Sequence, residues 1–213
     1  FRSPEFSILE WYRIGFDHHQ LMDDVEKLLS DIVTQISWRR ISCATLFQEA
    51  VGINPHTASD DLLFTRANLS VDLPAEDLRN RALMLDVIFS EQIQPTLPSG
   101  EALFVYDYPV EQAAYARIRS EEPMVASRFE LIIEGIEIAN GYHEVIDAVE
   151  QARRHALERK IRATRSQTDI DVDPECLAAL GQAMPESAGV AIGLDRLIIL
   201  ALGQQSIAEG RLL

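Results

Sequence analysis

Cysteine is scarce in this 213-residue chain: only Cys43 and Cys176 are present, too few for a disulfide framework or a cysteine-rich zinc site. No apolar run approaches the roughly 20 residues needed to cross a bilayer, and the start lacks the basic-then-apolar pattern of a signal peptide. Basic residues are few, since 19 Lys and Arg against 34 Asp and Glu give a formal net charge of −15. These absences predict a soluble, cytoplasmic protein without general attraction to polyanions.

A hydrophobic content of 47% with 25% charged residues is typical of a globular protein, so residues 1–213 are predicted to form one domain. Because the chain begins at Phe1 rather than Met, we expect it to be incomplete at its N-terminus. A basic stretch from Arg153 to Arg165 is the exception to the acidic composition. It indicates either a solvated helix face or a docking patch for an acidic partner.

Apolar residues recur at helical spacing in several segments. The expected helices cover about 19–36 and 43–52, then begin near 75, near Val145 and at Pro174, and end with 195–203. The stretch 54–74 mixes Asn, Pro, Ser, Asp and Thr, which predicts a loop or a small insertion.

Strands are expected from Phe6 onward, over 103–106, over 128–133 and 136–140 as a hairpin around Glu134-Gly135, and over 188–192. Strands and helices are interspersed without a βαβ rhythm. The pattern therefore predicts an α+β fold with a mainly antiparallel sheet flanked by helices.

Two acids share one face of the expected hairpin. With Glu134-Gly135 as the turn, Ile132 faces Glu137 and Glu130 faces Ala139, so Glu130 and Glu137 are diagonal neighbours at about 7–8 Å. Two carboxylates at this separation can converge on one cation, and all-oxygen ligation suits Mg²⁺. The alternative is that the acids only form the solvated face of an edge hairpin.

Glu144 follows Glu137 by seven residues, so in an unbroken strand the two side chains would point to opposite faces. We expect a bulge or turn at Asn140-Gly141, because Asn and Gly tolerate the positive φ that redirects a strand. Asn140, Tyr142 and Glu144 would then contact the polar ends of a ligand.

The first and last strands add further candidates. Glu10 and Tyr12 alternate with apolar residues and could hold an amine, although a surface glutamate is the simpler explanation. Near the C-terminus, small residues at 189, 191 and 193 would let a flat ligand lie against the backbone, or would only pack a helix closely on a strand. Arg196 follows in the first turn of the last helix, where it could stack on adenine and offset phosphate charge.

Four segments in this order resemble the catalytic domain of class II aminoacyl-tRNA synthetases, and in particular its lysine subgroup. They are Pro4–Tyr12 (second half of motif 2), Asp107–Val110, Arg128–Glu144 and Gly189–Arg196 (motif 3). Motif 1, which builds the family's dimer interface, is absent, as is the loop of motif 2. Arg2 is either the motif 2 arginine or a residue that only precedes Pro-Glu-Phe.

The resemblance implies ATP and Mg²⁺ as cofactors, a homodimer, and catalytic roles for Glu137 and Arg196. It implies an ATP site with adenine between Phe6 and Arg196, near Gly193 and Asn140, and Mg²⁺ on Glu130 and Glu137. The remaining implied roles concern the amino-acid substrate: Glu10, Tyr12 and Glu144 receive its side-chain ammonium, Asn140 and Tyr142 line the same pocket, and Ala191 shapes it.

Within the subgroup, the segments 9–12, 107–113 and 135–141 and the residue Ala191 are most similar to short paralogues of lysyl-tRNA synthetase. Those paralogues attach lysine, as its β isomer, to a lysine of translation elongation factor P. Lysyl-tRNA synthetases usually carry Gly where Ala139 and Ala191 stand. Two alternatives stay open: a true lysyl-tRNA synthetase, less favoured because nothing resembles an anticodon-binding domain, and a catalytically silent paralogue that serves as a binding module.

Overall fold

The computed structural model describes residues 5–71, 80–164 and 167–204. Arg2 and the expected helix start at 75–79 lie outside the described residues. In the described part, no helix combines the length and apolarity that crossing a membrane requires.

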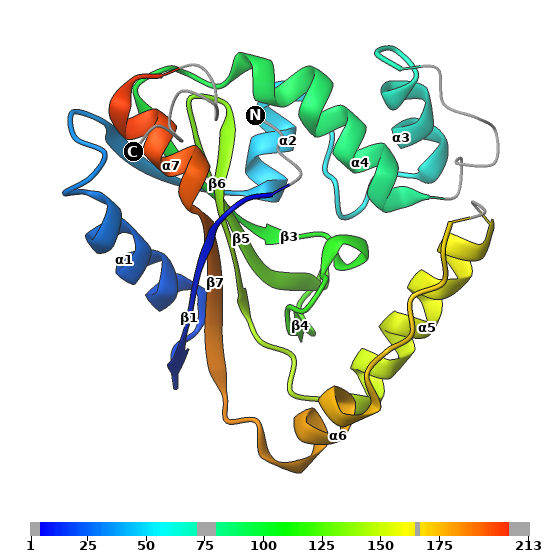
Figure 1. Cartoon of the computed structure of the whole chain (residues 1–213). Coiled ribbons are helices and arrows are strands. Elements are labelled where there is room, and N and C mark those ends of the chain that lie inside the picture. The colour runs from blue at the N-terminus through cyan, green and yellow to red at the C-terminus, as the bar shows by residue number, and fades with distance from the viewer. Residues whose placement is uncertain (1–4, 72–79, 165–166, 205–213) are drawn as a thin grey trace.

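A seven-stranded sheet forms the centre of the molecule (Figure 1). Its strands follow the order β1-β7-β6-β5-β3-β2, with β4 paired to β5. All pairings are antiparallel except that of β2 with β3. The mainly antiparallel α+β prediction is thus confirmed. The strands are β1 (Ile8–Ile14), β2 (Ser37–Ser42), β3 (Glu101–Tyr108), β4 (Ile118–Arg119), β5 (Val125–Ile133), β6 (Ile136–His143) and β7 (Ser187–Gly193).

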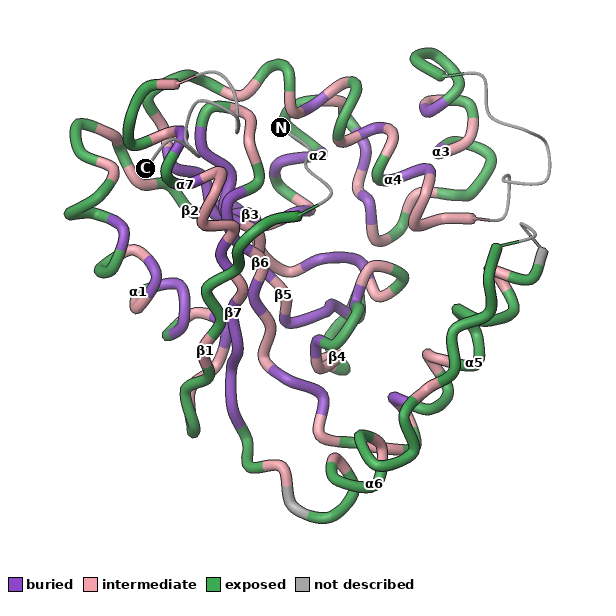
Figure 2. The backbone as a smooth tube through the Cα atoms, viewed as in Figure 1, coloured by how far each residue is buried: buried purple, intermediate pink, exposed green. Residues whose placement is uncertain are grey.

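Helices cover both faces of this sheet. On one face, α1 packs its apolar side chains on β5, β6 and β7, and on the other, α2, α3 and α4 pack beside β3 (Figures 1 and 2). On the second face, no described helix lies over β1, β7 and β6, and α5 and α6 stand to one side (Figure 1). The α-helices are α1 (His18–Leu29), α2 (Cys43–Val51), α3 (Asp60–Ala67), α4 (Arg81–Ile88), α5 (Ala148–Thr164), α6 (Pro174–Ala183) and α7 (Leu194–Leu202).

The expected helix over 19–36 was too long. Helix α1 ends at Leu29, and Ser30 caps it by donating its backbone N–H to the carbonyl of Glu26. Gln35 then adopts a positive φ of 62°, and the chain enters β2, which the helical spacing did not predict. Ile36 packs against the core on the α1 side. Its spacing from the apolar residues of α1 therefore fits a helix, although Ile36 is not helical.

Of the two interpretations of 54–74, the loop was wrong for eight residues, because α3 forms inside it, while the small insertion stays a prediction. The Ser59 hydroxyl accepts the Leu62 N–H at 3.3 Å and caps the helix, while Leu63 and Ala67 are completely buried. The following helix α4 starts at Arg81 after an Asn80 cap.

Other predictions were confirmed to within a few residues. Helix α2 ends at a left-handed Gly52, and α6 starts at Pro174. The hairpin turn Glu134-Gly135 has positive φ at both residues, 50° and 69°, as a two-residue hairpin turn requires. Strand β7 and helix α7 lie within a residue of their expected bounds.

Candidate active site

The candidate site lies on the sheet face opposite α1, where four strands put their side chains in one row. Glu10 on β1 pairs with Ala191 on β7, Ala191 pairs with Asn140 on β6, and Asn140 pairs with Glu130 on β5. Directly paired residues of neighbouring strands project to the same face. Residues from opposite ends of the sequence therefore meet along this row.

A second row runs beside the first, from Tyr12 through Gly189 and Tyr142 to Arg128. Gly189 is required here, because a Cβ at this position would lie 2.6 Å from Tyr12 Cε1 and 2.6 Å from Glu144 Oε1. The side chains of Tyr12 and Glu144 thus converge over the Gly189 backbone.

A bulge on β6 puts the side chains of Asn140 and Tyr142 on the same sheet face as Glu137. Ile132 pairs with Glu137 but Leu131 pairs with Ala139, which leaves Ile138 as an extra residue on β6. Ile138 and Ala139 both belong to the core on the α1 side. The bulge therefore reverses the alternation, so that the side chains beyond it return to the face that carries Glu137.

Two details of the predicted hairpin were wrong. Glu130 pairs with Asn140 instead of Ala139, and the bulge precedes Asn140-Gly141. Gly141 has a different purpose: a Cβ there would lie 2.3 Å from the ring of Phe129, so glycine permits close packing of that ring. The expected reorientation of Glu144 holds, although a different residue causes it.

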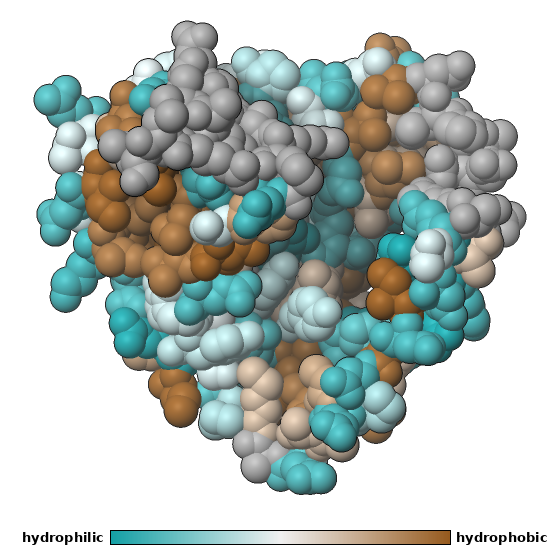
Figure 3. All heavy atoms as spheres, viewed as in Figure 1, coloured by the Kyte–Doolittle hydropathy of each residue, from teal (hydrophilic) through white to brown (hydrophobic). Residues whose placement is uncertain are grey.

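Glu130 and Glu137 line one pocket of about 400 Å³ between β5, β6 and the segment that follows α4. Each acid has an arginine partner: Arg128 pairs with Glu130, and Arg196 lies 3.6 Å from the Glu137 carboxylate. Figure 3 shows a hollow with hydrophilic side chains between α7 and α4. The two acids therefore lie together in the molecule, near Arg196.

The donor set of this pocket fits Mg²⁺. Burial and then the neighbouring charge of Glu130 raise the pKa of Glu137, which marks a place where a cation would relieve repulsion between the acids. Asp86 on α4 lines the same pocket, and burial raises its pKa as well. Two carboxylates leave room for the water and phosphate oxygens that Mg²⁺ retains.

Arg128 is the residue that sequence reasoning missed. Its guanidinium lies 4.6 Å from the ring centre of Tyr108 and 5.9 Å from that of Tyr142. It also donates to Asn140 Oδ1 at 3.3 Å and pairs with Glu130. Arg128 thereby fixes three of the candidate side chains. Its place two residues before Glu130, on the same strand face, was a signal that could have revealed it.

The start of β1 is fixed to the start of α7. The Ser7 N–H donates to Asp195 Oδ2 at 2.6 Å, and the Leu194 N–H donates to the Ser7 carbonyl at 3.0 Å. Phe6 is 62% exposed beside this junction, and Arg196 donates to the Glu137 carbonyl at 2.7 Å. No cation–π contact joins Phe6 and Arg196 among the described residues. Gly193 lies beside the Arg196 stem, where a Cβ would make only ordinary van der Waals contact, 3.6 Å from Arg196 Cδ.

Glu144 differs from the other acids because it is only 8% exposed and has no side-chain hydrogen bond or ion pair among the described residues. Burial raises its pKa to about 8. With Tyr12, it lies at the edge of a cavity of about 970 Å³ between the sheet, α5 and α6. Burial, and then Glu144 and Glu10, raise the pKa of Tyr12. This end of the site therefore favours a positively charged ligand.

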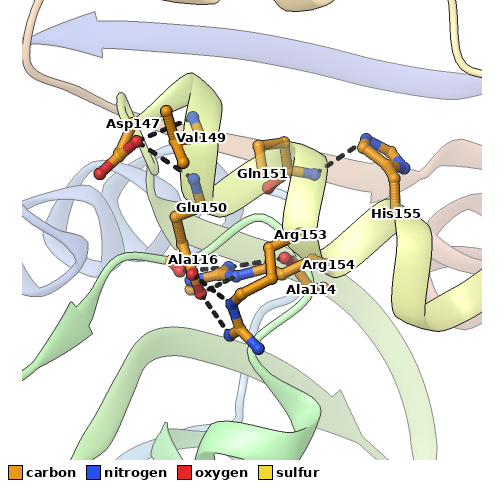
Figure 4. A network of polar contacts seen from close by, with 9 residues as sticks. All are labelled: Ala114, Ala116, Asp147, Val149, Glu150, Gln151, Arg153, Arg154 and His155. Carbon is orange, nitrogen blue, oxygen red and sulfur yellow. Dashed lines mark hydrogen bonds and ion pairs between the residues drawn. The ribbon is translucent and has the colours of Figure 1, made fainter.

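A polar network anchors α5 beside this cavity (Figure 4). Arg154 donates to the carbonyls of Ala114 and Ala116 at 2.8 Å each, and both Arg153 and Arg154 bond Glu150. Hydrogen bonds from Arg153, followed by those from Arg154, lower the pKa of Glu150 to about 2.

Further along the basic stretch, Arg159 pairs with Asp169 and Arg162 donates to the Thr168 carbonyl. Four of its arginines are thus engaged within the chain, which favours the interpretation as a helix face.

These features define an α+β synthetase-type domain, and residues 1–212 match the family of tRNA synthetases class II (D, K and N). The chain belongs to this family. Its relatives include proteins named elongation factor P–(R)-beta-lysine ligase from Vibrio cholerae (40% identical), Histophilus somni (39%) and Haemophilus influenzae (38%). Each match covers 97% of this chain. The chain spans 64% of the length of these relatives.

Proposed function

We propose that this protein activates lysine or β-lysine with ATP and transfers the acyl group to a lysine of elongation factor P. The observation that carries the proposal is the unpaired, buried carboxylate of Glu144, on the same sheet face as the Glu130–Glu137 pair. A buried charge without a partner is costly, so the site is built for a cation that arrives with the ligand. The names of the relatives supply the particular amino acid and acceptor.

At the amine end, Glu144 receives the side-chain ammonium of the substrate. Tyr12 and Glu10 lie on β1, which β7 separates from β6, and they add an oriented hydroxyl and a second negative charge. Asn140 and Tyr142 line the space between this end and the nucleotide. Ala191 is the small residue in the row between Glu10 and Asn140, and its methyl group limits the space near the reacting carboxylate.

At the nucleotide end, Phe6 and Arg196 hold the adenine between them, beside the open backbone at Gly193. Glu130 and Glu137 would hold Mg²⁺, which, when bound, offsets the negative charge of the phosphates. The guanidinium of Arg196 adds positive charge to the same end. Because Arg196 already contacts Glu137, nucleotide binding requires Arg196 to exchange this contact for the ligand.

The reaction needs no enzyme nucleophile. A carboxylate oxygen of the amino acid attacks the α-phosphorus of ATP, and pyrophosphate leaves as the bond to its bridging oxygen breaks. The acceptor amine then attacks the acyl carbon, AMP leaves with the bonding electrons, and the amine proton passes to solvent. Residues of this chain contribute by positioning the reactants and by offsetting charge.

We further propose a homodimer that acts in the cytoplasm, where translation factors function. Exposed apolar side chains on β1 and α7, including Ile8, Ile14 and Leu202, support an association surface, and a hydrophobic patch lies over the α7 region (Figure 3). Light scattering coupled to size-exclusion chromatography would measure the mass. A monomer at micromolar concentration would contradict the dimer.

The test of the function is amino-acid-dependent exchange of labelled pyrophosphate into ATP, performed on the full chain with lysine and with (R)-β-lysine. We expect exchange with at least one isomer and labelling of elongation factor P in the second step. Labelling of tRNA in place of the factor would identify a lysyl-tRNA synthetase. Absence of exchange with both isomers would favour the catalytically silent binding module.

A further inference from the structure

A second cluster of titratable side chains lies on the α1 side of the sheet, away from the candidate active site. His18 and His19 begin α1, and Asp107 lies near the end of β3. One potential ligand atom from each of the three lies within 4.8 Å of the others. His18 is 1% exposed, and its Nε2 lies 3.0 Å from Asp107 Oδ1. Two imidazoles and a carboxylate are thus gathered at one partly buried point.

Local structure fixes each member of the cluster. Asp17 caps α1 through a reciprocal bond pair with Gln20, which sets the first turn that carries both histidines. Asp107 has a positive φ of 59°, and the pairing of β3 with β5 shifts register at this residue. Arg119 lies 2.7 Å from Asp107 Oδ2. The Arg119 contact orients the carboxylate and leaves its other oxygen toward the histidines.

Among the described residues, neither imidazole has hydrogen bonds at both of its ring nitrogens, since His18 bonds Asp107 through Nε2 alone. His18 Nδ1 is buried without a partner. Within the described part of the chain, the His19 ring makes ring contacts alone, with its centroid 4.1 Å from that of His18 and 5.1 Å from that of Tyr106. An ion pair between His18 and Asp107 alone would not explain why the His19 imidazole lies beside them. Two imidazoles beside a carboxylate are a donor set that zinc prefers.

We propose that His18, His19 and Asp107 form a three-ligand site for a transition-metal ion of the zinc class, with water in the fourth position. Ligands about 2.0–2.1 Å from a tetrahedral ion lie about 3.3 Å from one another. The His18–Asp107 separation of 3.0 Å already matches this geometry, so only the His19 ring must approach. Arg119 holds the outer oxygen of Asp107, as hydrogen-bonded outer partners of ligating carboxylates do.

The surroundings of Asp107 and His18 also limit the affinity for the metal ion. A guanidinium beside the carboxylate opposes a dication, and metal at His18 Nε2 leaves a protonated Nδ1 buried without an acceptor. A micromolar rather than nanomolar dissociation constant follows from these costs. The site is independent of the proposed aminoacyl transfer, because none of its ligands lies on the face that carries Glu130, Glu137 and Glu144.

The test is Co²⁺ titration followed by visible absorption, with Zn²⁺ calorimetry as a second measurement. The full chain is used without a histidine tag and with Cys176→Ser, because Cys176 is exposed and could bind metal on its own. We expect one saturable site with the absorption of tetrahedral Co²⁺. His19→Asn and Asp107→Asn each weaken it by about tenfold or more.

His155→Asn on α5 is the matched control and leaves the dissociation constant unchanged. Asn tolerates positive φ, so Asp107→Asn keeps the backbone at this position. His19→Asn decides the question if the Asp107 variant unfolds, since His19 is only partly buried. No saturable binding, or equal binding by His19→Asn and the parent, would overturn the proposal.

Discussion

The two ends of the active-site face handle negative charge differently. At the nucleotide end, Glu130 is paired with Arg128, and Glu137 lies near Arg196. At the amine end, Glu144 is more buried than Glu137 and has no basic partner among the described residues. One end therefore keeps its own counter-charges within the chain, whereas the other leaves its acid for the ligand to neutralise.

This difference explains which end selects the substrate. Arg128 and Arg196 already offset part of the charge of Glu130 and Glu137, so a cation adds less there than beside an unpaired carboxylate. A buried carboxylate without a partner gains a charge-assisted bond as soon as an ammonium group arrives. The amine end should therefore determine which amino acid binds, while the nucleotide end determines how fast the bound amino acid reacts.

The largest expected effect comes from removing one acid at the nucleotide end. Glu137→Gln should reduce pyrophosphate exchange by about 1,000-fold, because the Mg²⁺ pair loses one carboxylate. Glu49→Gln, which removes an exposed acid on α2, serves as the control and should exchange normally. Far-ultraviolet circular dichroism should show the same fold in both variants. Exchange at the parental rate in Glu137→Gln would disprove the proposed metal pair.

The next effect belongs to the amine end. Glu144→Gln should raise the KM for lysine about 100-fold through loss of a hydrogen bond to a charged group, with the KM for ATP little changed. The parental KM should fall up to about tenfold per pH unit from pH 6 toward 8, as Glu144 ionises. The variant should lack this dependence. Initial rates across this pH range provide the measurement, and a parental pH profile in the variant would refute the role of Glu144.

Glu144→Gln, which weakens lysine binding, should increase the free energy of unfolding. Burial raises the pKa of Glu144 from 4.5 to about 8, so the folded state holds the proton more tightly than the unfolded state. The resulting stability is present below pH 4.5 and is lost as pH rises toward 8. Glu144→Gln should therefore be more stable than the parent at pH 8 by about 4 kcal/mol, with the difference almost gone near pH 4.5. Urea unfolding at both pH values would reveal a constant difference if the idea is wrong.

The smallest effect concerns Ala191, which lies between the two ends. Its methyl group occupies the row between Glu10 and Asn140, so Ala191→Gly should enlarge the pocket near the reacting carboxylate. We expect the preference between lysine and β-lysine to shift about tenfold toward lysine, the size of effect that one methyl group produces. Parallel kcat/KM measurements with both isomers test this. An unchanged ratio would remove Ala191 from the specificity argument.

Local sequence signals predicted the parts of the fold that depend on local chemistry. The Glu134-Gly135 turn, the left-handed Gly52 and the Pro174 helix start follow from backbone preferences. Non-local features were missed: Ile36 packs in the core without being helical, and β2 forms because β3 lies beside it. Helix α3 was overlooked because its polar residues resemble a loop.

The candidate site was likewise predicted where it depends on local sequence and missed where it depends on non-local packing. Motif residues identified the acids and Arg196, and the sheet brings them to one face. The extra residue Ile138 could not be predicted, because a bulge depends on packing of both Ile138 and Ala139 in the core. Arg128 was missed because its role depends on Tyr108, which the chain places against it from another strand.

The most direct test of the account is the number of protons released when lysine binds. Because burial holds the pKa of Glu144 at about 8, the free protein should carry this proton at pH 7 and lose it when an ammonium group arrives. Calorimetry of lysine binding in buffers of different ionisation enthalpy should give release of about 0.9 proton per site. Glu144→Gln should release none. No proton release by the parent, or equal release by both proteins, would contradict the claim that Glu144 awaits the cation of the substrate.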